Sequence, residues 1–391
     1  MPLQGGRMEM KIMTAIIHAN LVMPDHFIPD AVLLMENGVI VDFGRKLAIP
    51  ENAEIIDAEG LYVGPGLIDI HTHADGEYYF YENPEACSRK LLQHGVTSVL
   101  PALYYNLNKQ QYLDAIDTID SAVKSGKCPN IAGYYMEGPY LNPAFGCDRE
   151  NNPWKGAICK EDYAEILDKV KDTAKVWCLS PEREGTLDFV KDVKRQIPNI
   201  VFSVAHSEAT PEQIEEIIPY GLKLGTHHTN ATGTLESYPE CRGVCVDETV
   251  NYHNDIYAEL ICDSLGIHVH PYMLRLVSKI KGKDRIILIS DACVFHGPPI
   301  PGCEEAFDIN FDFDGEIAGS KMTLDIACHN MMVHTGCSVC DVFRYASLNP
   351  SRLLNLTDLG QIKKGNTANL VFVDHWFHIK KTIVKGEVFS E

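Results

Sequence analysis

The chain has 391 residues, 45% of them hydrophobic, which is enough to bury one large core and a smaller one beside it. Its 54 acidic residues outnumber 34 basic ones and give a formal charge of -20, which disfavours a surface for nucleic acid or anionic membrane. The start, Met1 to Met8, has no apolar core of the kind that a secretion signal needs, and no later run is long enough to span a membrane. We therefore expect a cytoplasmic protein without nucleic-acid or membrane partners.

Both ends of the chain have the pattern of short strands separated by turns. The strands expected are Lys11–Ile17, Ala31–Met35, Val39–Phe43, Glu54–Ala58, Ala368–Asp374 and Lys381–Val388. We expect the two ends to share one sheet assembly, a small β-sandwich domain of residues 1–62 and 361–391.

The middle of the chain, residues 63–360, alternates short apolar runs with longer amphipathic stretches, which is typical of repeated βα units. Helical periodicity occupies, for example, Glu161 to Lys175 and Pro211 to Tyr220. Eight strands are expected to begin near Leu67, Thr97, Ile131, Val176, Ile200, Leu222, Tyr257 and Ile286. This pattern predicts a closed (β/α)₈ TIM barrel.

The thirteen cysteines are scattered from Cys87 to Cys340, in a chain too large to need disulfide bonds, so we expect reduced and mostly buried thiols. Cys337 and Cys340 have the spacing of a redox or zinc pair, but no second pair lies at a suitable distance. We interpret this pair, and likewise Cys241 and Cys245, as structural.

His71 and His73 directly follow the apolar run of residues 63–70. Residues two apart on a strand point to the same face, so this strand would deliver two imidazoles side by side at its carboxyl end. A pair of strand-end histidines alone is more often structural than functional. Further candidate ligands at other strand ends favour a metal site.

These further candidates are polar groups that follow the third, fifth, sixth and eighth expected strands. They are Glu137, His206, His227, its neighbour His228, and Asp291. The carboxyl ends of barrel strands meet at one mouth, so four histidines and two carboxylates would converge there, with the part of His228 ambiguous. Such ligands suit Zn²⁺, Fe²⁺, Mn²⁺ or Co²⁺, and six of them are enough for one or two ions.

A divalent ion at this mouth would lower the pKa of a bound water toward neutrality, so that the water could attack a carbonyl carbon. Asp291 is the natural general base for that water. It could then pass the proton to the departing amine, which an amide requires because an unprotonated amine leaves poorly.

The chain resembles the metal-dependent amidohydrolase superfamily and, within it, the N-acetylglucosamine-6-phosphate deacetylases. The resemblance covers nearly the full length and rests on several stretches taken together. They are Pro65–His73, Glu137–Asn142, Ala205–Thr210, Thr226–Ala231, Gly266–Pro271, Ser290–Ala292, Ala318–Thr323 and Ser347–Pro350.

The resemblance implies roles for these residues. Glu137, His206 and His227 would hold the main ion, with Zn²⁺ the first expectation. His71 and His73 would hold a second ion, as in members that bind two, and Asp291 would be the acid and base. His268 would contact the sugar and help to polarise the scissile carbonyl, while Asn230 and Ala231 would add substrate contacts. The resemblance also implies a homodimer.

The chain departs from the family on the substrate side. After Glu137–Asn142 the family usually carries a Gly-Ala-His segment that reaches the phosphorylated sugar, whereas residues 145–150 here contain no histidine. The nearest basic candidate for a phosphate contact is Arg242.

The expected reaction is removal of the N-acetyl group from an amino sugar, first of all N-acetylglucosamine-6-phosphate, which gives the free amine and acetate. Alternatives are N-acetylgalactosamine-6-phosphate, an unphosphorylated amino sugar or an N-acyl amino acid. Cyclic amides are disfavoured, because the fourth strand end, Trp177 to Glu182, lacks the lysine that bridges two ions in those members. A non-catalytic scaffold is the least favoured reading, since all six ligand positions are filled.

Overall fold

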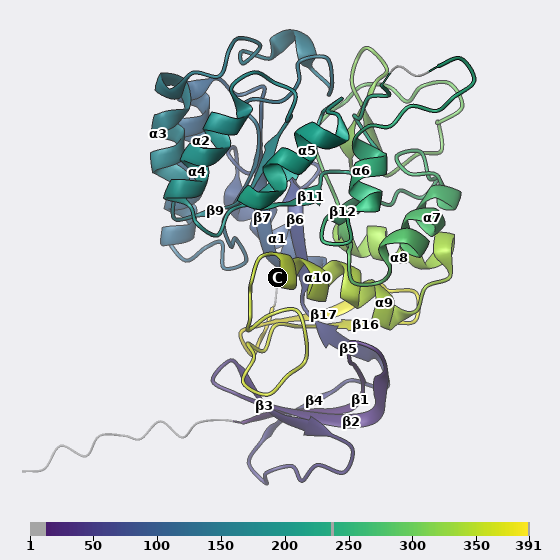
Figure 1. The fold of residues 1–391 in the computed structure, drawn as a ribbon. Helices are drawn as coiled ribbons and strands as arrows, with labels where there is room; N and C mark the ends of the chain where they lie inside the picture. The colour runs from purple at the N-terminus through teal and green to yellow at the C-terminus, as the bar shows by residue number, and fades with distance from the viewer. Residues whose placement is uncertain (1–12, 236–237, 390–391) are drawn as a thin grey trace, which may run out of the picture.

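The computed structural model describes residues 13–235 and 238–389. The stretch Met1 to Met8 and the first two residues of the strand expected from Lys11 lie outside this range. Figure 1 shows a barrel surrounded by helices above a smaller sheet, to which both ends of the chain contribute. Within the described residues, no helix has both the length and the hydropathy needed to cross a bilayer.

Eight parallel strands form the barrel, and each pairs with the next along the chain. They are β6 (Leu67–Thr72), β7 (Val96–Tyr104), β8 (Tyr134–Glu137), β9 (Ala174–Leu179), β10 (Val201–Val204), β11 (Leu222–Gly225), β12 (Tyr257–Ile261) and β13 (Ile286–Ile289). The last strand returns to the first, where the Asp291 amide donates to the His71 carbonyl at 2.9 Å. The TIM-barrel prediction is confirmed.

Helices cover the outside of the barrel between its strands (Figure 1). They are α1 (Pro84–Gln93), α2 (Lys109–Lys124), α3 (Lys160–Val170), α4 (Thr186–Gln196), α5 (Pro211–Ile217), α6 (Val246–Tyr252), α7 (Pro271–Lys281) and α8 (Leu324–Thr335), followed by α9 (Val339–Phe343) and α10 (Asn349–Leu353). Side chains of Asn108 and Thr210 cap α2 and α5 by accepting from backbone amides of the first turn. The helix expected over 161–175 ends earlier, at Val170, because Ala174 already begins β9.

The second sheet combines the two ends of the chain, as predicted. Its strands are β1 (Thr14–Val22), β2 (Phe27–Glu36), β3 (Val39–Gly44), β4 (Glu54–Asp57), β5 (Tyr62–Pro65), β16 (Leu370–Val373), β17 (Ile379–Val384) and β18 (Glu387–Val388). Their order is β18-β17-β16-β5-β1-β2-β3, with β4 beside β1. Val39, the first residue of β3, also bridges to Thr367, shortly before β16. The sheet therefore folds back on itself, and its two halves enclose the core of this domain. Since β5 is part of it, the sheet extends past the expected boundary at residue 62.

Gly66 joins the two sheets, because it is the single residue between β5 and β6. Its amide donates to Asn369 of the end sheet at 2.8 Å, and the next amide, of Leu67, donates to Gly95 at 3.0 Å. A Cβ atom at position 66 would lie 2.0 Å from Thr97 Oγ1. Only glycine allows this approach, which places β6 and its histidines.

We expect Gly66→Ala to lower the free energy of unfolding by about 1–3 kcal/mol, because the added methyl group overpacks the strand junction. Gly156→Ala is the control, since a Cβ atom there meets nothing within 4 Å. Urea unfolding followed by circular dichroism measures both. Equal stability of the two variants would contradict the role given to Gly66.

Candidate metal centre and active site

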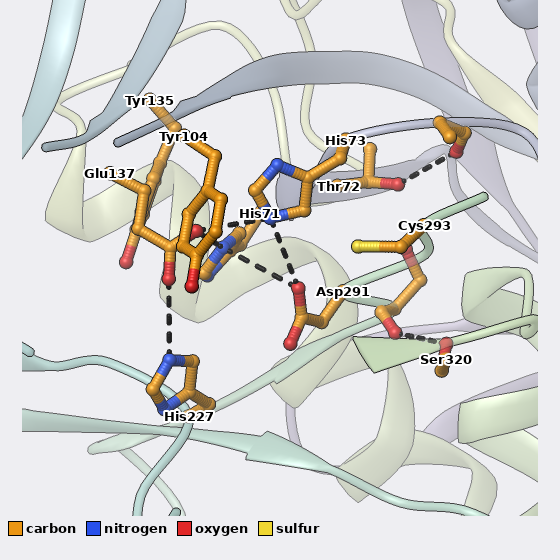
Figure 2. Close-up of polar contacts among 12 residues, drawn as sticks. His71, Thr72, His73, Tyr104, Tyr135, Glu137, His227, Asp291, Cys293 and Ser320 are labelled. Carbon is orange, nitrogen blue, oxygen red and sulfur yellow. Dashed lines mark hydrogen bonds and ion pairs between the residues drawn. The ribbon is translucent and has the colours of Figure 1, made fainter. Parts of the chain in front are cut away.

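The two histidines of β6 reach the mouth of the barrel as the spacing predicts. His71 and His73 face the same side, with ring centroids 5.4 Å apart, while Thr72 between them points away (Figure 2). Both imidazoles are buried. β6 is buried along its whole length, which holds the two rings in place.

The structure brings all six expected ligands together in two groups of three. One group is His71, His73 and Asp291, and the other is Glu137, His206 and His227, with the ligand atoms of each group within 4.8 Å of one another. The Glu137 carboxylate lies between the groups. Its Oε2 is 3.1 Å from His73 Nε2 and 3.4 Å from His71 Nε2. Its Oε1 is 2.9 Å from His206 Nε2 and 3.3 Å from His227 Nε2 (Figure 2).

The donor set fits a divalent metal ion. His71 Nε2 and Glu137 Oε2 are buried and lie within ion-pair distance of each other, but neither makes a hydrogen bond of good geometry. The Nε2 atoms of His206 and His227 lie 3.1 Å apart, so two ring nitrogens compete for the same space and the same carboxylate oxygen. Buried polar atoms that lack partners are costly, and a cation bound between them would satisfy these nitrogens and oxygens at once.

The electrostatics of the cluster lead to the same assignment. Burial alone raises the pKa of Glu137, but the facing imidazoles, His71 first, hold it well below its usual range. Burial lowers the pKa of His73, yet hydrogen bonds to Asp291 and Glu137 raise it to about 9. In the absence of metal, protons would therefore supply the positive charge that these carboxylates require.

Three of the ligand residues have strained backbones. The φ angles of His206, His227 and Asp291 are +44°, +28° and +47°, in the left-handed region that residues other than glycine rarely adopt. Each of them follows directly on a short barrel strand or comes two residues after one. The strain turns each side chain from the strand direction toward the mouth, and such strain is typical of functional sites.

His268 also faces this mouth. Its backbone amide and its Nδ1 both contact Asp263 Oδ2, at 2.8 and 3.2 Å, while its buried Nε2 has no partner. Burial raises the pKa of Asp263, but the hydrogen bonds from His268 and the Ile267 amide lower it to about 2, so the carboxylate is charged. Asn230 donates to the His268 carbonyl at 2.8 Å and keeps its own Oδ1 free.

A cavity of about 320 Å³ opens above the cluster. Its lining includes metal-site residues together with Asn230, Ala231 and His268, as expected. The rest of the lining includes five aromatic side chains, those of Tyr79, Tyr81, Tyr104, Phe145 and Phe295. Such walls suit the apolar faces of a small ring-shaped substrate.

Two residues that the sequence analysis considered, Arg242 and the ambiguous His228, lie away from the cavity. Arg242 is 78% exposed, pairs with Glu248 at 2.6 Å and does not line the cavity. His228 points away from the ligands toward Asn251, and burial lowers its pKa to about 4. An arginine that sequence reasoning missed, Arg149, does line the cavity and pairs with Glu316. Its place in the segment that departs from the family pattern was the available signal.

Comparison with known proteins extends these findings. The amidohydrolase family model matches residues 62–389. The chain is 29% identical to an N-acetylgalactosamine-6-phosphate deacetylase of Escherichia coli O157:H7, over 97% of this chain and all of that protein. It is 26% identical to an N-acetylglucosamine-6-phosphate deacetylase of Lysinibacillus sphaericus, over 90% and 92% of the two chains. The solved N-acetylglucosamine-6-phosphate deacetylase of Pasteurella multocida has the same fold, with a TM-score of 0.84, 24% identity and 97% and 100% coverage. Since the family model covers most of the chain, this protein belongs to the amidohydrolase family.

Proposed function

We propose that this protein hydrolyses the acetamido group of an N-acetylated amino sugar 6-phosphate, and first of all N-acetylglucosamine-6-phosphate, to the free amine and acetate. The observation that carries the proposal is the cluster of six buried candidate metal ligands, five of which line one cavity together with His268, whose Nε2 has no partner. Relatives that bear the names of such deacetylases, along almost the full chain, support it.

Glu137, His206 and His227 would hold the main divalent ion, with a second at His71 and His73, and we infer that Zn²⁺ is the first choice among Zn²⁺, Fe²⁺, Mn²⁺ and Co²⁺. Metal ions so placed polarise the scissile carbonyl and lower the pKa of the attacking water.

His268 orients the carbonyl oxygen of the substrate in this proposal. Its Nδ1 donates to the charged Asp263 carboxylate, and its Nε2 points into the cavity. Asp263 fixes the orientation of the ring, so that Nε2 is placed to contact the oxygen on which negative charge develops during attack.

Asp291 transfers the proton. Its Oδ1 lies 3.3 Å from His73 Nε2 and 3.6 Å from His71 Nε2, at the edge of the metal cluster, and the residue lines the cavity. The carboxylate takes the proton of the attacking water and gives it to the amine nitrogen as the C–N bond breaks.

Arg149 is our candidate for the phosphate contact, in place of Arg242. It lies within the altered segment, residues 145–150, and lines the cavity. Among the described residues its guanidinium donates only to Glu316, through one nitrogen. A guanidinium has five N–H donors, so its other nitrogens can bind phosphate oxygens while that ion pair remains.

A second sugar follows from the comparisons. The 29% identical relative is named for N-acetylgalactosamine-6-phosphate, which differs from the glucosamine compound in one hydroxyl configuration. A site that holds the acetamido group and the phosphate can accept either epimer unless a residue contacts the differing hydroxyl. The two sugars must therefore be measured side by side.

Acetate release from metal-loaded protein tests the function. The panel contains both sugar phosphates, their unphosphorylated forms and N-acetyl amino acids. We expect turnover of a sugar phosphate, and Asp291→Asn should lower kcat by about 10²–10⁴-fold because the proton carrier is lost. Turnover of N-acetyl amino acids alone, or full activity of the variant, would refute the proposal.

We expect Arg149→Ala to lower kcat/KM for the phosphorylated sugar by about 10- to 150-fold, since a charge-assisted hydrogen bond contributes about 1.5–3 kcal/mol. The unphosphorylated sugar should be unaffected. Arg195→Ala, an exposed arginine on α4, serves as the control. A selective loss in Arg242→Ala instead would return the phosphate contact to that residue.

A further inference from the structure

Glu259 is a carboxylate in the middle of β12 that the mechanism above does not use. It is completely buried, in the barrel interior beneath the metal ligands. Its Oε2 accepts from three donors: His71 Nδ1 at 3.2 Å, the Tyr135 hydroxyl at 3.1 Å and the His227 amide at 3.2 Å. Its Oε1 is buried without a partner.

A carboxylate at this position is expensive for the fold. The interior of such a barrel is normally filled with branched apolar side chains. Among the described residues no lysine or arginine pairs with Glu259, and His71 is its one ion-pair partner. A buried charge that is poorly compensated destabilises a protein, so its presence favours a functional role.

The contacts determine how the His71 ring is turned. Its Nδ1 lies against Glu259, so its Nε2 faces Glu137 at 3.4 Å and Asp291 at 3.6 Å. The Tyr135 ring stacks on the imidazole with centroids 4.1 Å apart (Figure 2) and donates to the same oxygen, so the ring plane is held as well.

Glu259 also connects the two ligand groups. The oxygen that holds His71, in one group, accepts from the backbone of His227, in the other. Glu259, Glu137 and Asp291 together place three carboxylates on the ligand imidazoles. Their combined charge exceeds what one divalent ion neutralises, which favours two.

We propose that Glu259 is a positioning residue that holds His71 with its Nε2 toward Glu137 and Asp291 and thereby builds a second divalent-cation position at His71, His73 and Asp291. The proposal rests on the proposed function, in which the six-residue cluster binds metal. Partners of this kind hold a ligating histidine in orientation and make it a stronger base.

Zinc titration of chelator-stripped protein, followed by calorimetry and by the metal content after gel filtration, tests this proposal. The wild type should bind two ions. Glu259→Gln keeps an acceptor but removes the charge, and it should bind the first ion normally and the second about 10- to 100-fold more weakly. Tyr135→Phe should weaken the second ion in the same direction, whereas Tyr134→Phe, whose hydroxyl bonds Asp120 outside the barrel, should not.

Stability of the stripped protein separates positioning from a purely structural role. Glutamine has nearly the same volume as glutamate and its side-chain oxygen can still accept from Tyr135 and from the His227 amide, so the thermal midpoint of stripped Glu259→Gln should stay close to that of the wild type. A clear fall in that midpoint, or unchanged affinity for the second ion, would overturn the inference. Wild-type protein that binds no divalent ion would instead overturn the proposed function itself.

Discussion

The shared carboxylate of Glu137 is the interaction on which the site depends. One oxygen faces the imidazoles of β6 and the other faces His206 and His227, so a single buried negative charge serves four rings. Without metal, protons on some of these imidazoles, His73 among them, would supply the positive charge that the carboxylate requires. The arrangement is therefore stable when cations replace the protons, which couples metal binding to the packing of the whole barrel mouth.

The barrel supplies this convergence through its backbone. The hydrogen bond from the Asp291 amide to the His71 carbonyl closes the barrel, and it joins two of the candidate ligands. Gly66 allows the chain to pass close to Thr97 where β5 of the end sheet ends and β6 of the barrel begins. The short segment around Gly66 therefore connects the cores of the two domains. The three strained backbones and the buried carboxylates destabilise the fold, and the packing of the strands around them offsets this destabilisation.

The substrate side of the cavity is built by loops, whereas the metal cluster is built by residues at strand ends. Arg149 comes from the segment after β8, whereas Glu316 comes from the turn before β15 (Ile317–Ser320), and the two meet across the cavity. Loop residues of this kind change without disturbing the barrel, so one metal site can serve several sugars or acyl groups. The division into an end domain and a barrel, with its boundary near β5, stays a prediction.

Strand periodicity and the position of polar residues at strand ends were enough to predict the barrel, the sheet shared by both chain ends and the six residues now found together, because alternation along a strand is a local property. The sequence also identified His268, Asn230 and Ala231 through short motifs. It could not separate His228 from His227, since only the backbone turn after β11 decides which ring faces the mouth. Nor could the sequence show that Arg149, rather than Arg242, lines the cavity. It did not single out Glu259 either, because an acidic residue in a strand is unremarked until the fold brings it against His71. Those contacts join residues far apart in the chain, and only the closed barrel brings them within hydrogen-bonding distance.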